Sequence, residues 1–242
     1  MNGIYFDGFG RGQSARATTA KEYSFDRDVE DIEGLRKALR LDQINVLGHS
    51  YGGMVAQAYA LRYPNSVKRL ILSNTLFSAE MWQAGVNNFN QIIQDQCPEV
   101  WTKLQQLRAE GFHSSAREYQ EANYSVPLGL FYFFDSSNIR KIAADPAPFN
   151  PDVFYTIAGD DAFFLVGGDV AKLDFRSQLK SLKMPVLILT GRFDRFVLPR
   201  YSLQFKRYAP QAEFVMFENA GHFPFIEEPA RTFEVVKRFL EK

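Results

Sequence analysis

A short apolar run that leads into a glycine-flanked serine constrains the fold of this chain more than any other feature. Residues 44–48 form the run, Gly48-His49-Ser50-Tyr51-Gly52 follows, and residues 54–63 have a helical pattern. In the order strand, sharp turn, helix, the pattern G-x-S-x-G holds a serine in a strained turn with its hydroxyl exposed at the carboxyl edge of a sheet. We expect a side chain at either flanking glycine to collide with the neighbouring strand or helix, and Gly53 to serve the same packing. Ser50 is therefore predicted to be a nucleophile.

Short apolar runs and helical patterns also alternate outside this motif. Residues 67–73 and 185–191 are nearly continuous in apolar character, which is typical of parallel strands that helices cover on both faces. Ile4-Tyr5-Phe6 has the pattern of the end of a further buried strand, so we expect about five strands in total. The predicted fold is therefore α/β, with a doubly wound and mostly parallel sheet. The remaining predicted elements are helices at 24–41, with Ser24 as N-cap, at 201–208 and at 229–240, and a strand at 213–217.

Aromatic residues gather in a long segment that interrupts this alternation. The chain has 23 Phe, 11 Tyr and 2 Trp, or 15% aromatic residues, and many of them lie between Thr75 and Arg176, where the patterns are helical. We predict an inserted helical cap at 76–176, between a first part of the core at 1–75 and a second part at 177–242. The aromatic side chains either line an apolar pocket or pack a cap that has little core of its own.

A serine hydroxyl needs a base within hydrogen-bond reach, and the chain has only three histidines to supply one. His49 adjoins Ser50, so we expect its side chain to point away from the hydroxyl and pack beneath the turn. His113 lies in the cap segment, where a solvated or capping role is expected. His222 lies in the loop between the last predicted strand and the last helix, at the edge where Ser50 is exposed. His222 is therefore predicted to be the base.

The base needs a carboxylate on its other ring nitrogen, which fixes the tautomer and stabilises the imidazolium. Asp194 directly follows the predicted strand at 185–191, which places it at the same edge of the sheet. Glu218 is the second candidate, but it lies nearer its strand than the tip of its loop. Asp194 is therefore the predicted partner of His222.

Composition and charge exclude several classes of function. Lys and Arg number 28, as do Asp and Glu, so the formal net charge is zero and binding to nucleic acid or an anionic membrane is not expected. The single cysteine, Cys97, excludes an internal disulfide, and we expect neither a metal nor an organic cofactor. The chain shows no signal-peptide pattern and no run of the ~18 apolar residues that a spanning helix needs, so we expect a cytoplasmic protein. If two copies associate, the exposed first strand is the expected contact.

Several stretches of the chain match the motifs of a known enzyme family. They are Asp7 to Ser14, which is similar to a D-x-x-G-x-G-x-S loop, Gly48 to Gly53, Asn150 to Phe154 with Gly159 and Phe163, Gly191 to Asp194, and Gly221-His222. On these stretches, which cover almost the whole length, the chain resembles the α/β-hydrolase superfamily and, within it, the prolyl iminopeptidase-like group. The resemblance implies a catalytic triad in the chain order Ser50, Asp194, His222. The serine argues against the dehalogenases and epoxide hydrolases of the same fold, which need a carboxylate at that position.

One departure from that group concerns substrate binding. In iminopeptidases a cap glutamate, in a G-P-x-E-F-like motif, holds the free α-amine of the substrate, and Ala162 stands at the matching position here. The alternative acids for this role are Asp160, Asp161, Glu118 and Glu121.

A second departure concerns the oxyanion. The family has further strands and an H-G-containing loop before the D-x-x-G-x-G segment, which starts at Asp7 here. That loop donates one of the two backbone N–H groups that stabilise the tetrahedral oxyanion, so the amide of Tyr51 is the one donor identified. Losing one donor costs about 3 kcal/mol of transition-state stabilisation.

The expected function is that of a serine hydrolase that forms an acyl-enzyme. Its substrate is expected to be a small molecule or a short peptide, cleaved at an ester, as by a carboxylesterase, or at an amide, as by an aminopeptidase. The first alternative is a ligand-binding or catalytically impaired protein with the same fold and an incomplete oxyanion hole. The second is a structural protein that pairs with another chain through its first strand.

Overall fold

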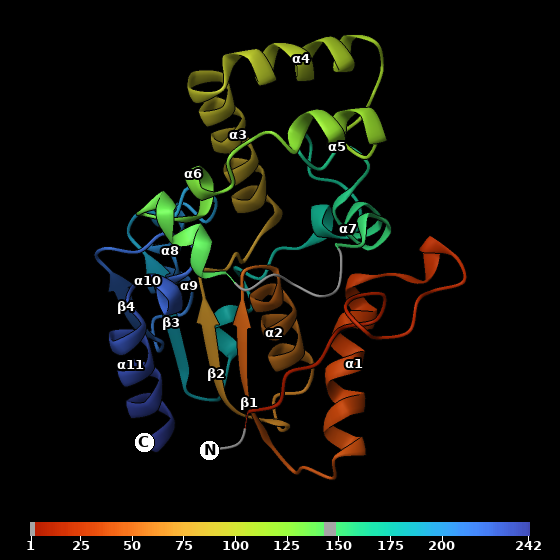
Figure 1. Cartoon of the computed structure of the whole chain (residues 1–242). Helices are drawn as coiled ribbons and strands as arrows, with labels where there is room; N and C mark the ends of the chain where they lie inside the picture. The colour runs from red at the N-terminus through yellow and green to blue at the C-terminus, as the bar shows by residue number, and fades with distance from the viewer. Residues whose placement is uncertain (1–2, 143–148) are drawn as a thin grey trace.

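The computed structural model of the chain describes residues 3–142 and 149–242 and contains a sheet of four parallel strands in the order β1-β2-β3-β4 (Figure 1). The register pairs Leu47 with Ile71, and Ile71 with Leu187. The strands are β1 (Ile44–His49), β2 (Val67–Ser73), β3 (Val186–Gly191) and β4 (Glu213–Phe217).

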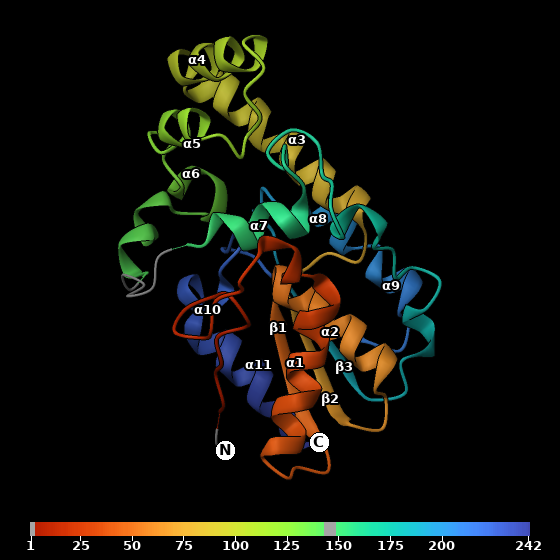
Figure 2. The same cartoon turned by 90° about the vertical axis from the view of Figure 1, so that its right-hand side faces the viewer.

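Different helices cover the two faces of this sheet, as Figures 1 and 2 show together. On one face α2 packs against β1 and β2, and α1 packs against α2. On the other face Val235 and Phe239 of α11 pack with Ile71 of β2 and Leu187 of β3. Side chains of β2 therefore alternate between two apolar cores, one on each face of the sheet, as in a doubly wound fold. The helices of this layer structure are α1 (Phe25–Ala38), α2 (Tyr51–Arg62), α8 (Pro199–Ser202), α9 (Phe205–Tyr208), α10 (Pro224–Glu227) and α11 (Pro229–Glu241).

The helices between β2 and β3, which we call the cap, lie above the carboxyl ends of the strands (Figure 1). They have an apolar cluster of their own, which includes Ile93, Leu104, Tyr119, Val126 and Phe131. The cap helices are α3 (Ala79–Gln96), α4 (Pro98–Ala109), α5 (Arg117–Asn123), α6 (Gly129–Tyr132) and α7 (Pro151–Ala158). Short 3-10 turns complete the chain at η1 (Ala20–Glu22), η2 (Ser136–Lys141), η3 (Val170–Lys172) and η4 (Leu179–Ser181).

Local sequence signals account for most element boundaries. The side chain of Ser24 accepts a hydrogen bond from the amide of Arg27, at 3.1 Å, and so caps α1 as predicted. The predicted helix at 201–208 is instead two short helices, α8 and α9, because the chain turns at Leu203 and Gln204. The predicted α/β fold class is confirmed, whereas the predicted lengths of individual helices agree less closely with the structure.

The predicted strand at Ile4-Tyr5-Phe6 is wrong. These residues are not in a strand, and Tyr5 is 98% exposed. Three apolar residues without a paired neighbour gain neither ladder hydrogen bonds nor burial, so their sequence pattern does not make them a strand. The sheet consequently has four strands instead of about five, and β1 is an edge strand on which Leu47 is 57% exposed. In the two described ranges, no helix is long and apolar enough to cross a membrane.

Candidate active site

Ser50 lies in the turn between β1 and α2 with φ 54° and ψ −125°. A positive φ is rare for a residue with a side chain, and it is stable only where the surroundings fix it. The Ser50 amide donates to the carbonyl oxygen of Ser73 at 3.0 Å, and the Thr75 hydroxyl donates to the carbonyl oxygen of Ser50 at 2.6 Å. The carboxyl end of β2 therefore holds the strained turn in place.

Two of the three glycines around this turn are required by close packing. A Cβ on Gly48 would lie 2.4 Å from the carbonyl oxygen of Gly52, and a Cβ on Gly53 would lie 2.3 Å from the hydroxyl oxygen of Thr75. The prediction is confirmed for Gly48 and Gly53. It is wrong for Gly52, where a Cβ would meet no atom within 4 Å because this residue faces open space.

The imidazole of His222 and the carboxylate of Asp194 form a buried hydrogen-bonded pair. Nδ1 of His222 donates to Oδ2 of Asp194 at 2.8 Å, and each residue is 2% exposed. Oδ2 also accepts from the side-chain amide of Asn74 at 2.9 Å, and Oδ1 accepts from the amides of Phe196 and Val197 at 2.9 and 2.8 Å. Because a carboxylate only accepts, Nδ1 of His222 is the donor of this bond, so it is Nε2 that has the lone pair in the neutral form of the ring.

Segments far away in the chain hold the loop that carries His222. The His222 amide donates to the carbonyl oxygen of Tyr132, in the cap, at 2.7 Å. The carboxylate of Glu227 accepts from the Gly221 amide at 2.6 Å and from the Phe134 and Asp135 amides at 3.2 and 3.1 Å. The cap and α10 are therefore joined through this loop.

The other two histidines and Glu218 lie where the sequence indicated. Nε2 of His49 donates to the carbonyl oxygen of His222 at 2.8 Å, and burial of the ring lowers the pKa of His49 to about 3. His113 pairs with Asp160 in the cap. Glu218 is exposed and pairs with an arginine, so Asp194 is the carboxylate that contacts His222.

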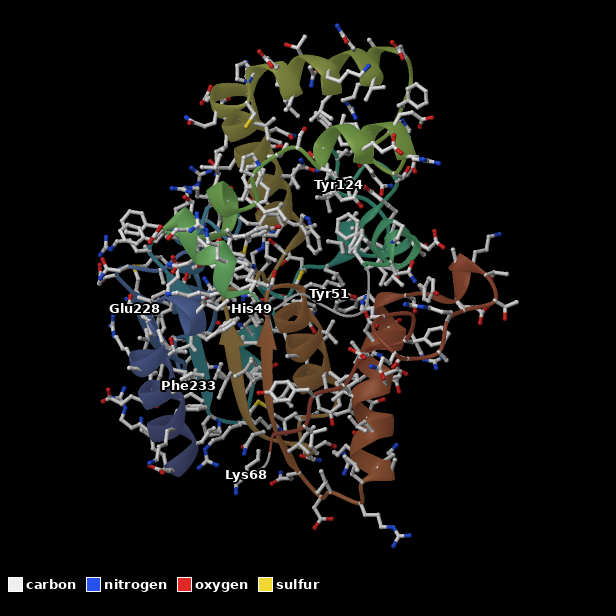
Figure 3. All side chains as sticks on the ribbon, viewed as in Figure 1. His49, Tyr51, Lys68, Tyr124, Glu228 and Phe233 are labelled. Carbon is white, nitrogen blue, oxygen red and sulfur yellow. The ribbon has the colours of Figure 1, made fainter. Side chains whose placement is uncertain are left out.

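Ser50 and the His222 pair both lie at the junction of core and cap, and no hydrogen bond joins Ser50 to His222 in the described structure. Figure 3 shows His49 and Tyr51, the neighbours of Ser50, at the upper end of the sheet beneath the cap helices. The His222 ring centroid lies 4.7 Å from that of His49, 5.3 Å from that of Tyr132 and 6.1 Å from that of Phe196. In the part of the chain that the structure describes, no hydrogen bond uses the Ser50 hydroxyl, which leaves it free for a base or a ligand.

A cavity of about 450 Å³ opens above Ser50 between the core and the cap. This volume is in the range of small-molecule sites. Many aromatic residues contribute to its wall, so at least part of the aromatic content lines a pocket, and the cap also has its own core. The wall includes Ser50, Tyr51, Trp82, Phe89, Tyr119, Phe131, Tyr132, Phe154, Phe163 and Phe196.

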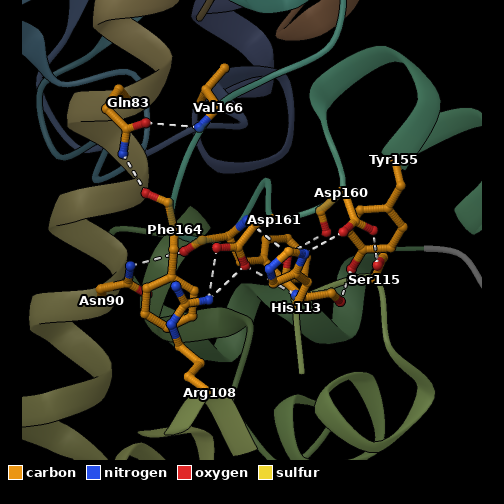
Figure 4. Close-up of polar contacts among 12 residues, drawn as sticks. Gln83, Asn90, Arg108, His113, Ser115, Tyr155, Asp160, Asp161, Phe164 and Val166 are labelled. Carbon is orange, nitrogen blue, oxygen red and sulfur yellow. Dashed lines mark hydrogen bonds and ion pairs between the residues drawn. The ribbon is translucent and has the colours of Figure 1, made fainter. Parts of the chain in front are cut away.

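The four acids that could have replaced the cap glutamate lie outside this wall. Asp161 pairs with Arg108 at 2.6 Å, and Asp160 bonds to His113 and Ser115 (Figure 4). Glu118 and Glu121 are exposed on α5. None of these four alternative acids is among the described residues that line the cavity, and Asp160 and Asp161 already have partners in the cap.

Sequence reasoning missed three supporting residues. Asn74, buried with φ 46°, donates to Asp194 and also to the Gly221 carbonyl oxygen at 3.0 Å. Thr75 holds the Ser50 carbonyl, and Glu227 holds the His222 loop. A polar pair directly after an apolar strand was a signal that could have identified Asn74 and Thr75, whereas nothing local marks Glu227. Within residues 3–142 and 149–242, no group of three or more His, Cys, Asp or Glu side chains could hold a metal ion.

Comparison with known proteins agrees with this geometry. The sequence profile described as the alpha/beta hydrolase fold matches residues 3–229. The proline iminopeptidase of Heyndrickxia coagulans is 29% identical over 242 residues, which are 98% of this chain and 80% of that protein. The proline iminopeptidase of Clostridium botulinum is 30% identical over 250 residues, with 99% of this chain and 80% of that protein covered. An alpha/beta fold family hydrolase from Bacillus anthracis has a similar structure, with a TM-score of 0.72 at 22% identity over 96% of this chain and 80% of that one.

Proposed function

Because the chain belongs to the α/β-hydrolase fold family, and within it to the prolyl iminopeptidase-like group, we propose that it is a serine hydrolase that cleaves a small ester or amide through an acyl-enzyme. The observation that carries this proposal is the strained Ser50 turn on the wall of a cavity beside the buried Asp194–His222 pair. A serine that is held in a strained turn and left without a partner is accessible to a carbonyl carbon.

In the proposed reaction the Ser50 oxygen attacks the carbonyl carbon while Nε2 of His222 takes the hydroxyl proton. The bond from the carbonyl carbon to the leaving group then breaks, and His222 returns the proton to the leaving alcohol or amine. Water attacks the acyl-enzyme with the same help from His222, which releases the acid and restores the serine. Asp194 keeps the Nδ1 proton in place and stabilises the imidazolium at each step.

Backbone amides would stabilise the oxyanion that forms in each step. Tyr51 is the first residue of α2, so its amide has no partner within the helix. Gly12 lines the same cavity, and no hydrogen bond in the described ranges uses its amide. We assign Tyr51 as one donor and Gly12 as the candidate for the second.

Covalent labelling with an alkyl fluorophosphonate tests the proposal, because this reagent reacts with an activated serine. We expect one adduct on the wild type, located at Ser50 by mass spectrometry, and none on Ser50→Ala. No adduct on a folded wild type would favour the alternative of a ligand-binding protein with an incomplete oxyanion hole.

The choice between ester and amide needs substrates. A prolyl arylamide and an aryl butyrate form the first panel, and turnover of the ester without turnover of the arylamide would exclude the peptidase form of the proposal. The cytoplasmic location stays a prediction.

Self-association also stays a proposal, but the expected contact between two copies is no longer at residues 4–6. Because residues 4–6 are not a strand, β1 and β4 are the two outer strands of the described sheet, and the edge of β1, beside the exposed Leu47, is the proposed contact. Sedimentation of the wild type and of Leu47→Lys tests it, and a strictly monomeric wild type would remove it.

A further inference from the structure

One charged residue, Arg11, is present among the described residues that line the cavity. Its guanidinium forms a two-pronged ion pair with Asp28, at 2.7 and 2.9 Å. The hydroxyl of Tyr51 donates to the same carboxylate. Asp28 is 8% exposed. Its carboxylate therefore joins the Arg11 guanidinium to the Tyr51 hydroxyl at the edge of the cavity. The positive charge of Arg11 is therefore already neutralised before any ligand binds.

The polar groups of the wall are otherwise uncharged in the described part of the chain. The side-chain NH₂ group of Asn90 donates to the carbonyl oxygen of Phe163, and that of Asn150 donates to the carbonyl oxygen of Gly10, both at 2.9 Å. Asn123 lines the cavity and its side chain makes no hydrogen bond in the described ranges. The rest of the wall is mainly aromatic and aliphatic side chains.

A substrate cation in this cavity would lose its hydration without gaining a carboxylate from the described residues of the wall. Desolvation of an unpaired charge costs more free energy than contact with an apolar wall returns. A substrate anion would meet an Arg11 whose positive charge Asp28 already neutralises, so it would gain less from this guanidinium than from an unpaired one. A neutral apolar acyl group meets neither cost and gains by burial.

On this basis, and resting on the proposed serine hydrolase function, we propose that the cavity selects an uncharged apolar acyl group and discriminates against an acyl group that carries a free α-ammonium. The natural substrate class is then a neutral ester or amide of a carbocyclic, aryl or short aliphatic acid. A peptide with a free amino-terminal residue is outside this class.

Two aryl esters that differ in one group test the proposal. Proline and cyclopentanecarboxylate have rings of the same size, but proline has NH₂⁺ where the other has CH₂. With the same leaving group, we expect kcat/KM for the cyclopentanecarboxylate ester to be at least about tenfold higher, which is about 1.4 kcal/mol. Equal or faster turnover of the prolyl ester would overturn the proposal and leave the serine hydrolase function standing. Faster turnover of a hemiglutarate ester than of the neutral ester would overturn it as well, since Arg11 would then bind an anion.

Binding to Ser50→Ala separates this proposal from the proposed catalysis. Calorimetry with the anilides of cyclopentanecarboxylic acid and of proline needs no turnover. Tighter binding of the neutral anilide supports the selectivity even if the wild type hydrolyses nothing and takes no fluorophosphonate. Equal or tighter binding of the proline anilide overturns it.

A single carboxylate in the wall should change the preference. Asn123→Asp has the same shape and breaks no hydrogen bond of the described structure, so we expect the ratio of prolyl to cyclopentanecarboxylate turnover to rise about tenfold. Asn87→Asp is the matched control, because Asn87 is exposed on α3 and its oxygen accepts from Gln83 in either form. An unchanged ratio in Asn123→Asp, with the protein folded, would show that charge in the wall does not set the preference and would overturn the proposal.

Discussion

The turn that carries Ser50 and the loop that carries His222 reach the same junction, but different parts of the molecule hold them. The turn is held by its own sheet, through Ser73 and Thr75 at the end of the adjacent strand. Gly48 fits directly against the backbone of α2, and Gly53 fits against the side chain of Thr75. The contacts that fix Ser50 therefore come from the end of the adjacent strand and from the start of α2, and the motif marks only the glycines among them.

The His222 loop is held by partners from three places. Tyr132 from the cap accepts from its backbone, Glu227 of α10 ties it to the cap, and Asn74 after β2 donates to the Gly221 carbonyl. Packing is tight here too, since a Cβ on Gly191 would lie 1.9 Å from the carbonyl oxygen of Gly221. We infer that changes in the cap can displace His222 and leave Ser50 in place.

Replacing a histidine gives the largest expected effect. His222→Ala removes the proposed base, so we expect kcat/KM for an activated ester to fall about 10⁴-fold or more. His113→Ala should change it less than about threefold, because His113 is exposed in the cap and pairs with Asp160. Steady-state kinetics of both variants check this, and equal losses would show that the base is wrongly assigned.

A methyl group added at Gly48 should destabilise the protein. We expect Gly48→Ala to lower the free energy of unfolding by about 2 to 3 kcal/mol, since its Cβ would lie 2.4 Å from a backbone oxygen. Gly52→Ala is the matched control in the same turn, and it should be neutral or slightly stabilising, because nothing lies within 4 Å and alanine favours a helix. Urea unfolding measures both values, and similar values would contradict the close packing of the turn.

The contrast between the two regions also explains what the sequence could predict. The need for glycine at position 48 and the N-cap at Ser24 depend on neighbours in the chain, so their patterns are sufficient, and the apolar pattern at 213–217 predicts β4 at its observed bounds. Asp194 and His222 were predicted from their positions after strands, and the structure joins them by a hydrogen bond. Glu227 could not be predicted, because its bond to the Phe134 amide spans 93 residues. The strand at residues 4–6 failed for the opposite reason, since its local pattern is suitable but no paired neighbour covers it.

Removing the link between loop and cap should produce a moderate effect on catalysis. Glu227→Ala leaves the Gly221, Phe134 and Asp135 amides without their acceptor, so we expect kcat to fall about tenfold with KM less affected. Glu227→Gln keeps an acceptor oxygen and should recover part of the loss. Glu218→Ala is the control at the start of the same loop, because the exposed Glu218 carboxylate pairs with Arg192 and accepts from no backbone amide of the loop or the cap in the described structure. If Glu227→Ala lowers only the stability, with kcat unchanged, the loop does not depend on the cap for its position.

The smallest expected effect concerns His49, whose side chain joins the Ser50 turn to the carbonyl oxygen of His222. Burial and the neighbouring His222 lower its pKa from the ordinary 6.5 to about 3 in the folded protein. Between these values the unfolded chain binds a proton that folded His49 does not, so acid favours unfolding and the free energy of unfolding rises with pH. This one group should contribute about 1 kcal/mol of change between pH 5.5 and pH 6.5. Urea unfolding of His49→Gln, which keeps a side-chain NH donor, should show a pH dependence weaker by that amount. An unchanged slope would mean that folding does not lower the pKa of His49, and would contradict a bond between turn and loop through a neutral imidazole.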